Sequence, residues 1–331
     1  MPGNNIKVSV VIPTYKVEQY IERCARSLFG QTLDSIEYIF VDDCSPDNSI
    51  AVMQKVLEEY PHRKDQVKII RHEVNQGVGA ARNNGVAACS GDYIIHCDPD
   101  DWVDLNMYET MYNKAVECSA DMVYCDYYEG YLHNNIPKSK TGTCNPELLI
   151  DDVLFRNENR SLCDKLFKQE IALSFTINCP DHIIMGEDLL RVVQMLKLCE
   201  SIAYVPENFY FYRMNPSSIT KSHWKKSVLQ SLLVIGTLLP AILENGKHGA
   251  AINFFQCSNL LCMIKHPEVT STKEFYSYSS DIGIKNIKDA MQFMEQQRKI
   301  ILTVALKNYD LACLMCRFVL FINSLLRKIK K

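Results

Sequence analysis

The sequence has no uninterrupted run of about 20 apolar residues, the length that a membrane-spanning helix requires. The uncharged stretch 227–243 contains Gly236 and Pro240, and the apolar stretch 311–326 contains Arg317. Because both stretches are interrupted, we expect them to form buried or surface-lying helices rather than full membrane spans.

The sequence also lacks a surplus of basic charge. Its 331 residues carry 36 Lys+Arg against 39 Asp+Glu, a formal net charge of -3, and 47% of them are hydrophobic. This composition is typical of a folded protein and argues against a disordered chain or a polybasic nucleic-acid binder, so we expect no nucleic-acid partner. The charge is uneven, because residues 298–331 hold eight basic residues and one acidic residue. An acidic body therefore precedes a basic end.

An apolar signal segment is missing from the first residues, so the fourteen cysteines do not indicate the disulfide framework of a small secreted protein. Cys257 with Cys262, and Cys313 with Cys316, lie in helix-like apolar runs without paired histidines. A structural zinc site is therefore the less favoured alternative. We expect reduced, mostly buried thiols in a cytoplasmic protein.

Two glycine-rich nucleotide-binding turns are absent: there is no GxxxxGK[ST] loop, and no GxGxxG turn follows the first predicted strand. The first hundred residues instead alternate apolar, β-branched runs with helical spacing. Strands that lack a polar face and alternate with helices predict an α/β fold, with a Rossmann-like, mostly parallel sheet flanked by helices. The predicted strands are 7–12, 37–41, 67–71 and 93–96, and the predicted helices are 17–29, 50–59 and 78–88.

The rest of the chain is less regular. From about residue 222 onward the pattern is mostly helical, which predicts a helical C-terminal extension. Between the two regions we predict helices at 107–117 and 189–198, strands at 122–125 and 204–213, and a polar loop at 134–143.

Ligands of parallel α/β sheets bind at the carboxyl ends of the strands. The most informative of these ends follows strand 93–96, where Asp98, Asp100 and Asp101 occur within four positions. Like charges so close raise one another's pKa unless a cation is present. Their oxygens suit Mg²⁺ or Mn²⁺. The alternative is an acidic turn in which Asp101 caps the next helix.

Three strings between residues 9 and 102 carry a resemblance to a known family: SVVIPTYKVEQYIERCARSL, IFVDDCSPDNS and NQGVGAARNNGVAACSGDYIIHCDPDDW. Together they resemble the family 2 glycosyltransferases of the GT-A fold. Weaker matches, CDKLFK, GEDLLRV and FYFYRMNPSSIT, extend the resemblance to about residue 220. It implies a GT-A domain over 1–220, with a nucleotide-binding half at 1–105 and an acceptor half at 106–220, before a helical region at 221–331.

The resemblance implies a pocket for the nucleotide base at the ends of the first two strands. Pro13, Thr14 and Tyr15 would line a uracil pocket. Asp43 would accept a hydrogen bond from the base N–H, and Asp42 would support it. A plain turn that ends a strand is the alternative interpretation of these two acids.

The resemblance also implies residues for the phosphates and the metal. Asp98 and Asp100 match the DxD element of the family, with Asp100 as the metal ligand and Asp98 nearer the ribose or sugar. Arg82 would meet a phosphate or the donor sugar, unless it is an exposed helical arginine. Arg213 lies in a segment that closes over the nucleotide in relatives, so it would pair with the diphosphate.

The catalytic base of an inverting member is an acid in an ED pair at the start of a helix. Here the pair is Glu187 and Asp188, and the resemblance makes Asp188 the base. Acids that merely favour the positive end of the helix dipole are the alternative. Lys165 and Glu187 would lie on the acceptor side.

These residues imply a metal-dependent, inverting glycosyltransferase with Mn²⁺ or Mg²⁺ as cofactor. It would move a hexose or N-acetylhexosamine from a UDP-sugar to a saccharide or lipid-linked saccharide acceptor in cell-surface glycan synthesis. A sugar-nucleotide pyrophosphorylase is one alternative, but it would carry a Gly-rich loop with Arg and Lys where Pro13, Thr14 and Tyr15 stand. A non-catalytic carbohydrate-binding relative is another, and it would be expected to lose Asp100 or Asp188.

The basic end has two interpretations. Residues 327–331 (RKIKK) follow the apolar stretch 311–326, a combination that can lie on the inner face of the cytoplasmic membrane, where each basic residue adds about 1 kcal/mol. A solvated tail after a core helix is the alternative. His96 and His182 stand alone in the sequence, and we expect them to be packing or surface histidines.

Overall fold

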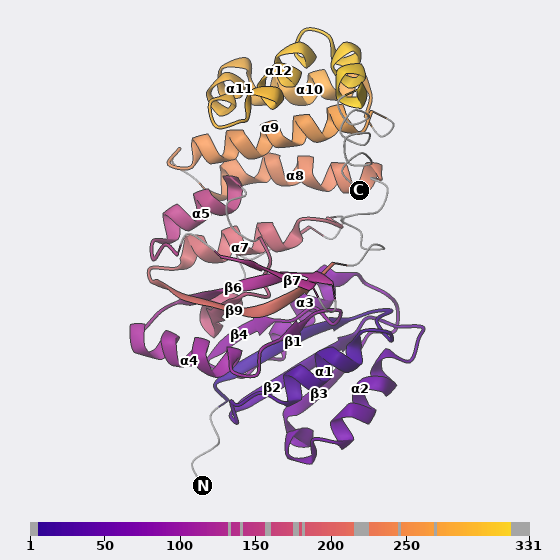
Figure 1. Ribbon diagram of the computed structural model, residues 1–331, viewed down its shortest axis with the longest axis vertical. Coiled ribbons are helices and arrows are strands. Elements are labelled where there is room, and N and C mark those ends of the chain that lie inside the picture. Colours follow the sequence, from indigo (N-terminus) through magenta and orange to yellow (C-terminus); the bar gives the residue numbers. More distant parts are fainter. Residues whose placement is uncertain are drawn as a thin grey trace. The chain divides into compact units, whose positions relative to one another are not determined.

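The computed structural model describes residues 6–131, 134–139, 142–155, 160–174, 179–180, 183–214, 225–243, 246–267 and 270–318 (Figure 1). The chain divides into two compact units, 1–218 and 219–331. Each unit is described below by itself.

The first unit is built on a nine-stranded sheet with strand order β3-β2-β1-β4-β8-β6-β9-β5, and β7 pairs with β6. The first four strands in this order are parallel, and antiparallel pairs enter through β5, β7 and β8. The strands are β1 (Val8–Thr14), β2 (Ile36–Asp42), β3 (Val67–Arg71), β4 (Tyr93–His96), β5 (Trp102–Val103), β6 (Met122–Tyr131), β7 (Asn134–Lys138), β8 (Lys165–Lys168) and β9 (Ile202–Arg213).

Both faces of the parallel strands are covered (Figure 1). Alternate residues of a strand point to opposite faces, so Val10 packs with the helices on one face while Val11 packs with Ala81 on the other. This is why β1 and β2 are continuous apolar runs. The helices of this unit are α1 (Ile21–Phe29), α2 (Ser49–Glu58), the 3₁₀ helix η1 (Pro61–Gln66), α3 (Val78–Ala87), α4 (Met107–Cys118), α5 (Pro146–Phe155), α6 (Gln169–Ala172) and α7 (Glu187–Leu198).

Helix α3 lies unusually close to the sheet at Gly85. A Cβ atom at this position would be 2.4 Å from Cγ1 of Val11 and 3.1 Å from Cγ2 of Val41. The missing side chain therefore allows α3 to lie directly on β1 and β2.

The polar loop predicted for 134–143 is wrong in its first half. Residues 134–138 form β7, which pairs antiparallel with β6, and β6 continues to Tyr131 instead of ending near residue 125. An edge strand leaves one side open to solvent, so it tolerates polar residues and Pro137. Such a strand has the composition of a loop.

The second unit is helical in its described residues, as predicted. It contains α8 (Lys226–Ile242), α9 (Gly249–Lys265), α10 (Thr272–Ile282), α11 (Ile284–Met291), α12 (Gln296–Ala305) and a helix at 309–318. Asn259 of α9 is buried and donates to the carbonyl of Leu232 in α8 at 2.9 Å. Within the described ranges, no helix has both the length and the apolar character to cross a membrane. The predicted basic tail, 327–331, and His182 lie outside the described residues.

Candidate active site

The carboxyl ends of β1, β2 and β4 lie at one edge of the sheet because these strands are parallel and in register. Thr14 is the register partner of Asp42, and Val11 is the partner of His96. The segments after these strands, which carry Tyr15, Asp43 and the Asp98–Asp101 turn, therefore start at the same edge. This is the edge at which the sequence predicts the ligand-binding residues.

Asp43 organises the segment that leads into α3. Its buried carboxylate is 2.7 Å from Nδ1 of His72, and it accepts from the backbone N–H groups of Gln76 at 2.7 Å and Gly77 at 2.8 Å. Asn84 of α3 contacts the other ring nitrogen of His72 at 2.8 Å. Asp43 thus holds both the start and the middle of α3, a role that the sequence did not indicate.

The other residues of the predicted base pocket lie nearby along the strands. Pro13 and Thr14 are buried in β1, and the following Tyr15 is 39% exposed. The Asp42 carboxylate accepts from the backbone N–H of Ser45 at 2.9 Å. Of the three residues predicted to line the base pocket, Tyr15 is therefore the one whose side chain is exposed.

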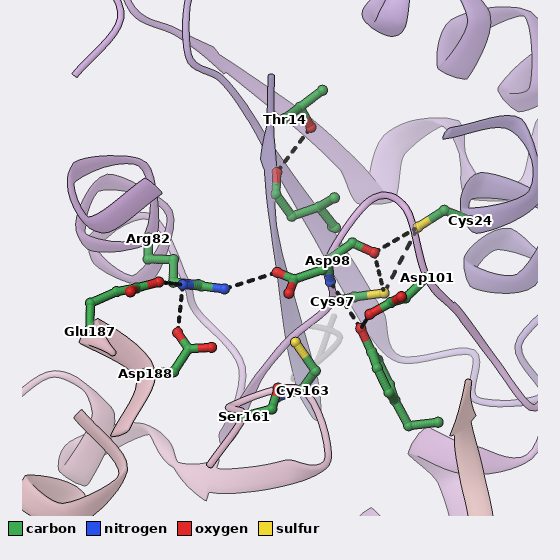
Figure 2. A network of polar contacts seen from close by, with 12 residues as sticks. Thr14, Cys24, Arg82, Cys97, Asp98, Asp101, Ser161, Cys163, Glu187 and Asp188 are labelled. Atoms are coloured by element: carbon green, nitrogen blue, oxygen red, sulfur yellow. Dashed lines mark hydrogen bonds and ion pairs between the residues drawn. The ribbon is translucent and has the colours of Figure 1, made fainter. Parts of the chain in front are cut away.

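Arg82 joins three carboxylates from distant parts of the chain (Figure 2). Nη2 donates to Oδ1 of Asp98 at 2.9 Å, and Nη1 donates to Oε1 of Glu187 at 2.7 Å. Nη1 also lies 2.5 Å from Oδ1 of Asp188. Because Arg82 is 2% exposed, it is not the exposed helical arginine of the alternative interpretation. Three carboxyl groups thus share one guanidinium at this point.

A second arginine makes the contact between α3 and α7 reciprocal. Arg191 of α7 donates to Oδ1 of Asn83 at 2.7 Å and to the carbonyl of Gly79 at 3.2 Å. Arg191 follows Glu187 by one helical turn, so both face α3. The two helices are therefore held by polar contacts from both sides.

The environment of Asp188 changes its acidity. Burial raises the pKa of Asp188 to about 8, while Arg82 opposes the rise and Glu187 and Asp98 add to it. A carboxylate of this kind can accept a proton near neutral pH, as a general base must.

The Asp98–Asp101 turn is held in place by hydrogen bonds from β9. The backbone N–H of Asp101 donates to the carbonyl of Asp98 at 3.0 Å. The buried carboxylate of Asp101 accepts from the hydroxyl of Tyr210 at 2.5 Å and from the backbone N–H of Arg213 at 2.7 Å. Asp101 does not cap the next helix, because α4 begins at Met107 with Asn106 as its N-cap.

Asp98 and Asp100 are the candidate metal ligands. Burial, followed by the charge of Asp98, raises the pKa of Asp100 to about 6, although the positive charge of Arg213 opposes the rise. No group of three or more His, Cys, Asp or Glu side chains suitable for a metal occurs in the described part of the chain. Two carboxylates fit a Mg²⁺ or Mn²⁺ ion that takes its other ligands from substrate phosphates and water.

Two predicted residues have other partners. The ammonium of Lys165 is buried and donates to Asp164 at 2.7 Å and to the carbonyl of Ser161 at 2.8 Å, so its acceptor role stays a prediction. The guanidinium of Arg213 lies over the ring of Tyr20, at 4.2 Å from its centroid. His96 is buried and its pKa is far below the usual value because of burial, which fits a packing histidine.

A model of glycosyl transferase family 2 matches residues 9–191 of the chain. The putative glycosyltransferase EpsH of Bacillus subtilis is 27% identical over 293 residues, which cover 84% of this chain and 82% of EpsH. The poly(ribitol-phosphate) beta-glucosyltransferase of Bacillus spizizenii is 30% identical over 211 residues, 62% of this chain and 32% of that protein.

Solved structures share the fold. The crystal structure of S. aureus TarS 1–349 in complex with UDP-GlcNAc has a TM-score of 0.64 and 19% identity, and the match covers 93% of this chain and 89% of that one. This likeness confirms the predicted GT-A fold. The family model spans more than half of the chain and includes Asp43, Arg82, Asp98 and Asp188. The chain therefore belongs to glycosyl transferase family 2 and is a glycosyltransferase.

Proposed function

We propose that the protein is a metal-dependent, inverting glycosyltransferase that moves a hexose or N-acetylhexosamine from a UDP-sugar to a saccharide or lipid-linked saccharide. The observation that carries the proposal is the contact of one guanidinium, that of Arg82, with both Asp98 and Asp188. It brings a candidate metal ligand and a candidate base within reach of a single side chain at the ligand edge of the sheet.

The donor is proposed to bind at the ends of β1 and β2. Tyr15, Pro13 and Thr14 would line the uracil pocket, with Asp42 and Asp43 at its polar side. Three of the lone-pair sites of Asp43 are already used by His72, Gln76 and Gly77, which leaves room for one further donor such as the base N–H. The UDP-GlcNAc complex of TarS, a protein of the same fold, supports a UDP-sugar as donor.

Asp100 and Asp98 are proposed to hold Mn²⁺ or Mg²⁺. When bound, the metal would offset negative charge on the departing UDP. The excess of carboxylates around Arg82 and the raised pKa of Asp100 both favour a cation at this turn.

Asp188 is proposed to be the base. The acceptor hydroxyl oxygen attacks the anomeric carbon, its proton passes to the Asp188 carboxylate, and the bond from the anomeric carbon to the diphosphate breaks with its electron pair leaving on UDP. Attack from the side opposite to UDP inverts the anomeric configuration. Glu187 shares Arg82 with Asp188 and would lie on the acceptor side.

A cell-surface glycan is the proposed product. The support is the similarity to a poly(ribitol-phosphate) glucosyltransferase, whose named acceptor is a polymer. Release of UDP from a panel of UDP-sugars, with and without Mn²⁺ and with candidate acceptors, tests the proposal. Metal-dependent UDP release with one sugar supports it, whereas binding of saccharide without any UDP release would favour the non-catalytic alternative.

A peripheral contact with the inner face of the cytoplasmic membrane is also proposed. Leu311, Leu314 and Phe318 are 48%, 61% and 65% exposed and share one face of helix 309–318, ahead of the basic residues of 327–331. Deleting residues 317–331, or replacing the basic residues of 327–331 by Gln, should reduce sedimentation with phosphatidylglycerol vesicles while UDP-sugar binding is retained. Unchanged sedimentation of both variants would refute the contact.

A further inference from the structure

We infer that Arg23 and Arg213 together form a phosphate-binding site beside the Asp98–Asp101 turn. The inference rests on the proposed function for the identity of the phosphate, and it goes beyond that function because the residues proposed for the base, the metal and the proton transfer do not include Arg23. The site would take a phosphoryl group, either from the diphosphate of the donor or from a phosphate of the acceptor.

Each of the two arginines lies over an aromatic ring from the other part of the site. Cζ of Arg23, in α1, is 3.4 Å from the ring centroid of Trp102, and Cζ of Arg213, at the end of β9, is 4.2 Å from that of Tyr20. Tyr20 and Arg23 lie one turn apart at the start of α1. Trp102 in turn stacks on Phe211, its register partner in β9, with ring centroids 5.3 Å apart. The start of α1 and the end of β9 therefore face each other at this point.

The two arginines differ in their contacts from a neighbouring arginine of α1, although the charge of Arg213 also lowers the pKa of Asp100. Arg26, one turn further along α1, forms ion pairs with Glu22 and Glu59. In the described ranges, Arg23 and Arg213 have no carboxylate within ion-pair distance, and their cationic groups meet aromatic rings instead. Burial and then the charge of Arg213 lower the pKa of Arg23, as expected for two like charges that lie close together and repel each other. An anion bound between them would remove this repulsion.

Stacking on a ring leaves the donors at the edge of a guanidinium available. The N–H groups lie in the plane of the group and match two oxygens of a phosphate, while the ring below holds the plane in place. Arg213 is also fixed by its backbone N–H, which donates to Asp101 at 2.7 Å. A phosphate bound here would consequently lie next to the metal-binding turn.

The contacts that Arg82 already makes also support a phosphate site at Arg23 and Arg213. The resemblance implies that Arg82 contacts a phosphate or the donor sugar, but its Nη1 and Nη2 atoms already meet Glu187, Asp188 and Asp98. A diphosphate at the edge of the sheet therefore needs cations from elsewhere in the protein. Arg23 and Arg213 are cations near the turn that carry no such carboxylate contacts in the described part of the chain.

The test measures binding to the full chain rather than turnover. UDP and uridine are titrated calorimetrically in the presence of Mn²⁺, and inorganic phosphate binding is followed by ³¹P NMR with and without saturating UDP. The variants are Arg23→Gln, Arg213→Gln and Arg23→Lys, and Arg26→Gln is the matched control on the same helix. Thermal unfolding of each variant shows that it is folded.

If the phosphate comes from the donor, Arg23→Gln and Arg213→Gln should each lower the affinity for UDP by about ten-fold or more. The affinity for uridine should stay unchanged. UDP should then displace inorganic phosphate. If it comes from the acceptor, UDP affinity should stay unchanged, and the UDP-loaded wild type should still bind phosphate in an Arg23-dependent way. Arg23→Lys should be intermediate in either case, and Arg26→Gln should behave as wild type.

The inference would be overturned if both Gln variants bound UDP and phosphate as tightly as the wild type does. The proposed function would still stand in that case, because the wild type would bind UDP. Arg23-dependent phosphate binding without any UDP binding would refute the UDP donor and keep the phosphate site. Binding of neither ligand by the wild type would overturn both.

Discussion

Nη1 of Arg82 lies 2.5 Å from Oδ1 of Asp188, although the two residues belong to helices α3 and α7, which are far apart in the sequence. The candidate base therefore faces a buried positive charge that is held in place by Asp98 and Glu187. This charge opposes the rise in pKa that burial gives to Asp188. Arg82 thus keeps Asp188 more ionised than burial alone would allow.

The pH dependence of the reaction should report on Asp188. A base must be deprotonated to act, and the pKa of Asp188 is raised to about 8 by burial, so kcat/KM should increase with pH through that region. Arg82→Gln removes the positive charge that lowers the pKa of Asp188. The acidic limb of the pH profile of kcat/KM should therefore move to higher pH by about one unit. Arg82→Lys keeps a charge and should move it less. Identical limbs for wild type and Arg82→Gln would show that Arg82 does not control the base.

Tyr210 should affect the metal more than the fold. Its hydroxyl lies 2.5 Å from the Asp101 carboxylate and accepts from the backbone N–H of Asp98 at 3.3 Å. Tyr210→Phe should therefore make the Asp98–Asp101 turn less rigid and lower the affinity for Mn²⁺ by about ten-fold. This is the usual effect of losing a group that orients metal ligands. Electron paramagnetic resonance of free Mn²⁺ in the presence of UDP measures this affinity.

The control for Tyr210 is another buried tyrosine. The hydroxyl of Tyr93 donates to the carbonyl of Ala120 at 2.9 Å. Tyr93→Phe should lower stability but leave Mn²⁺ binding unchanged. Equal Mn²⁺ affinity in Tyr210→Phe and Tyr93→Phe would contradict the role of Tyr210.

Two glycines of α3 should respond in opposite ways to alanine. Gly85→Ala would place a Cβ 2.4 Å from Val11 and should destabilise the protein by about 1–3 kcal/mol in urea unfolding. Gly79 has no atom within 4 Å of such a Cβ, so Gly79→Ala should be neutral or stabilise by about 0.4–1 kcal/mol. Equal stability of the two variants would mean that α3 does not rest on β1 as described.

The first half of the fold was predictable because its strands are buried on both faces. A run such as β1 is apolar at almost every position, and this pattern survives without knowledge of the neighbouring strands. The edge strand β7 was not predictable, since Asn134–Lys138 has the composition of a loop. Its pairing partner, and not its own residues, makes it a strand.

The candidate site was predictable as a set of carboxylates but not as a network. Asp98 and Asp188 follow from motifs, whereas the position of Arg82 depends on how α3 and α7 pack. The segment around Arg82 has no clear apolar periodicity, so burial of its side chain could not be inferred locally. The alternative that made Asp101 a helix cap is wrong for a similar reason, because a local helix cap and a distant Tyr210 are equally compatible with the sequence. A signal for Arg191 did exist, in its spacing of one helical turn from Glu187.

The most direct test of the account is the transfer rate of Asp188→Asn together with its affinity for the UDP-sugar. If Asp188 takes the proton of the acceptor, kcat should fall by about 10²–10⁴-fold while the Kd of the donor stays close to that of wild type. Glu187→Gln, which keeps the base, is the matched control and should lose less. Transfer by Asp188→Asn at the wild-type rate would contradict the central claim that this carboxylate is the base.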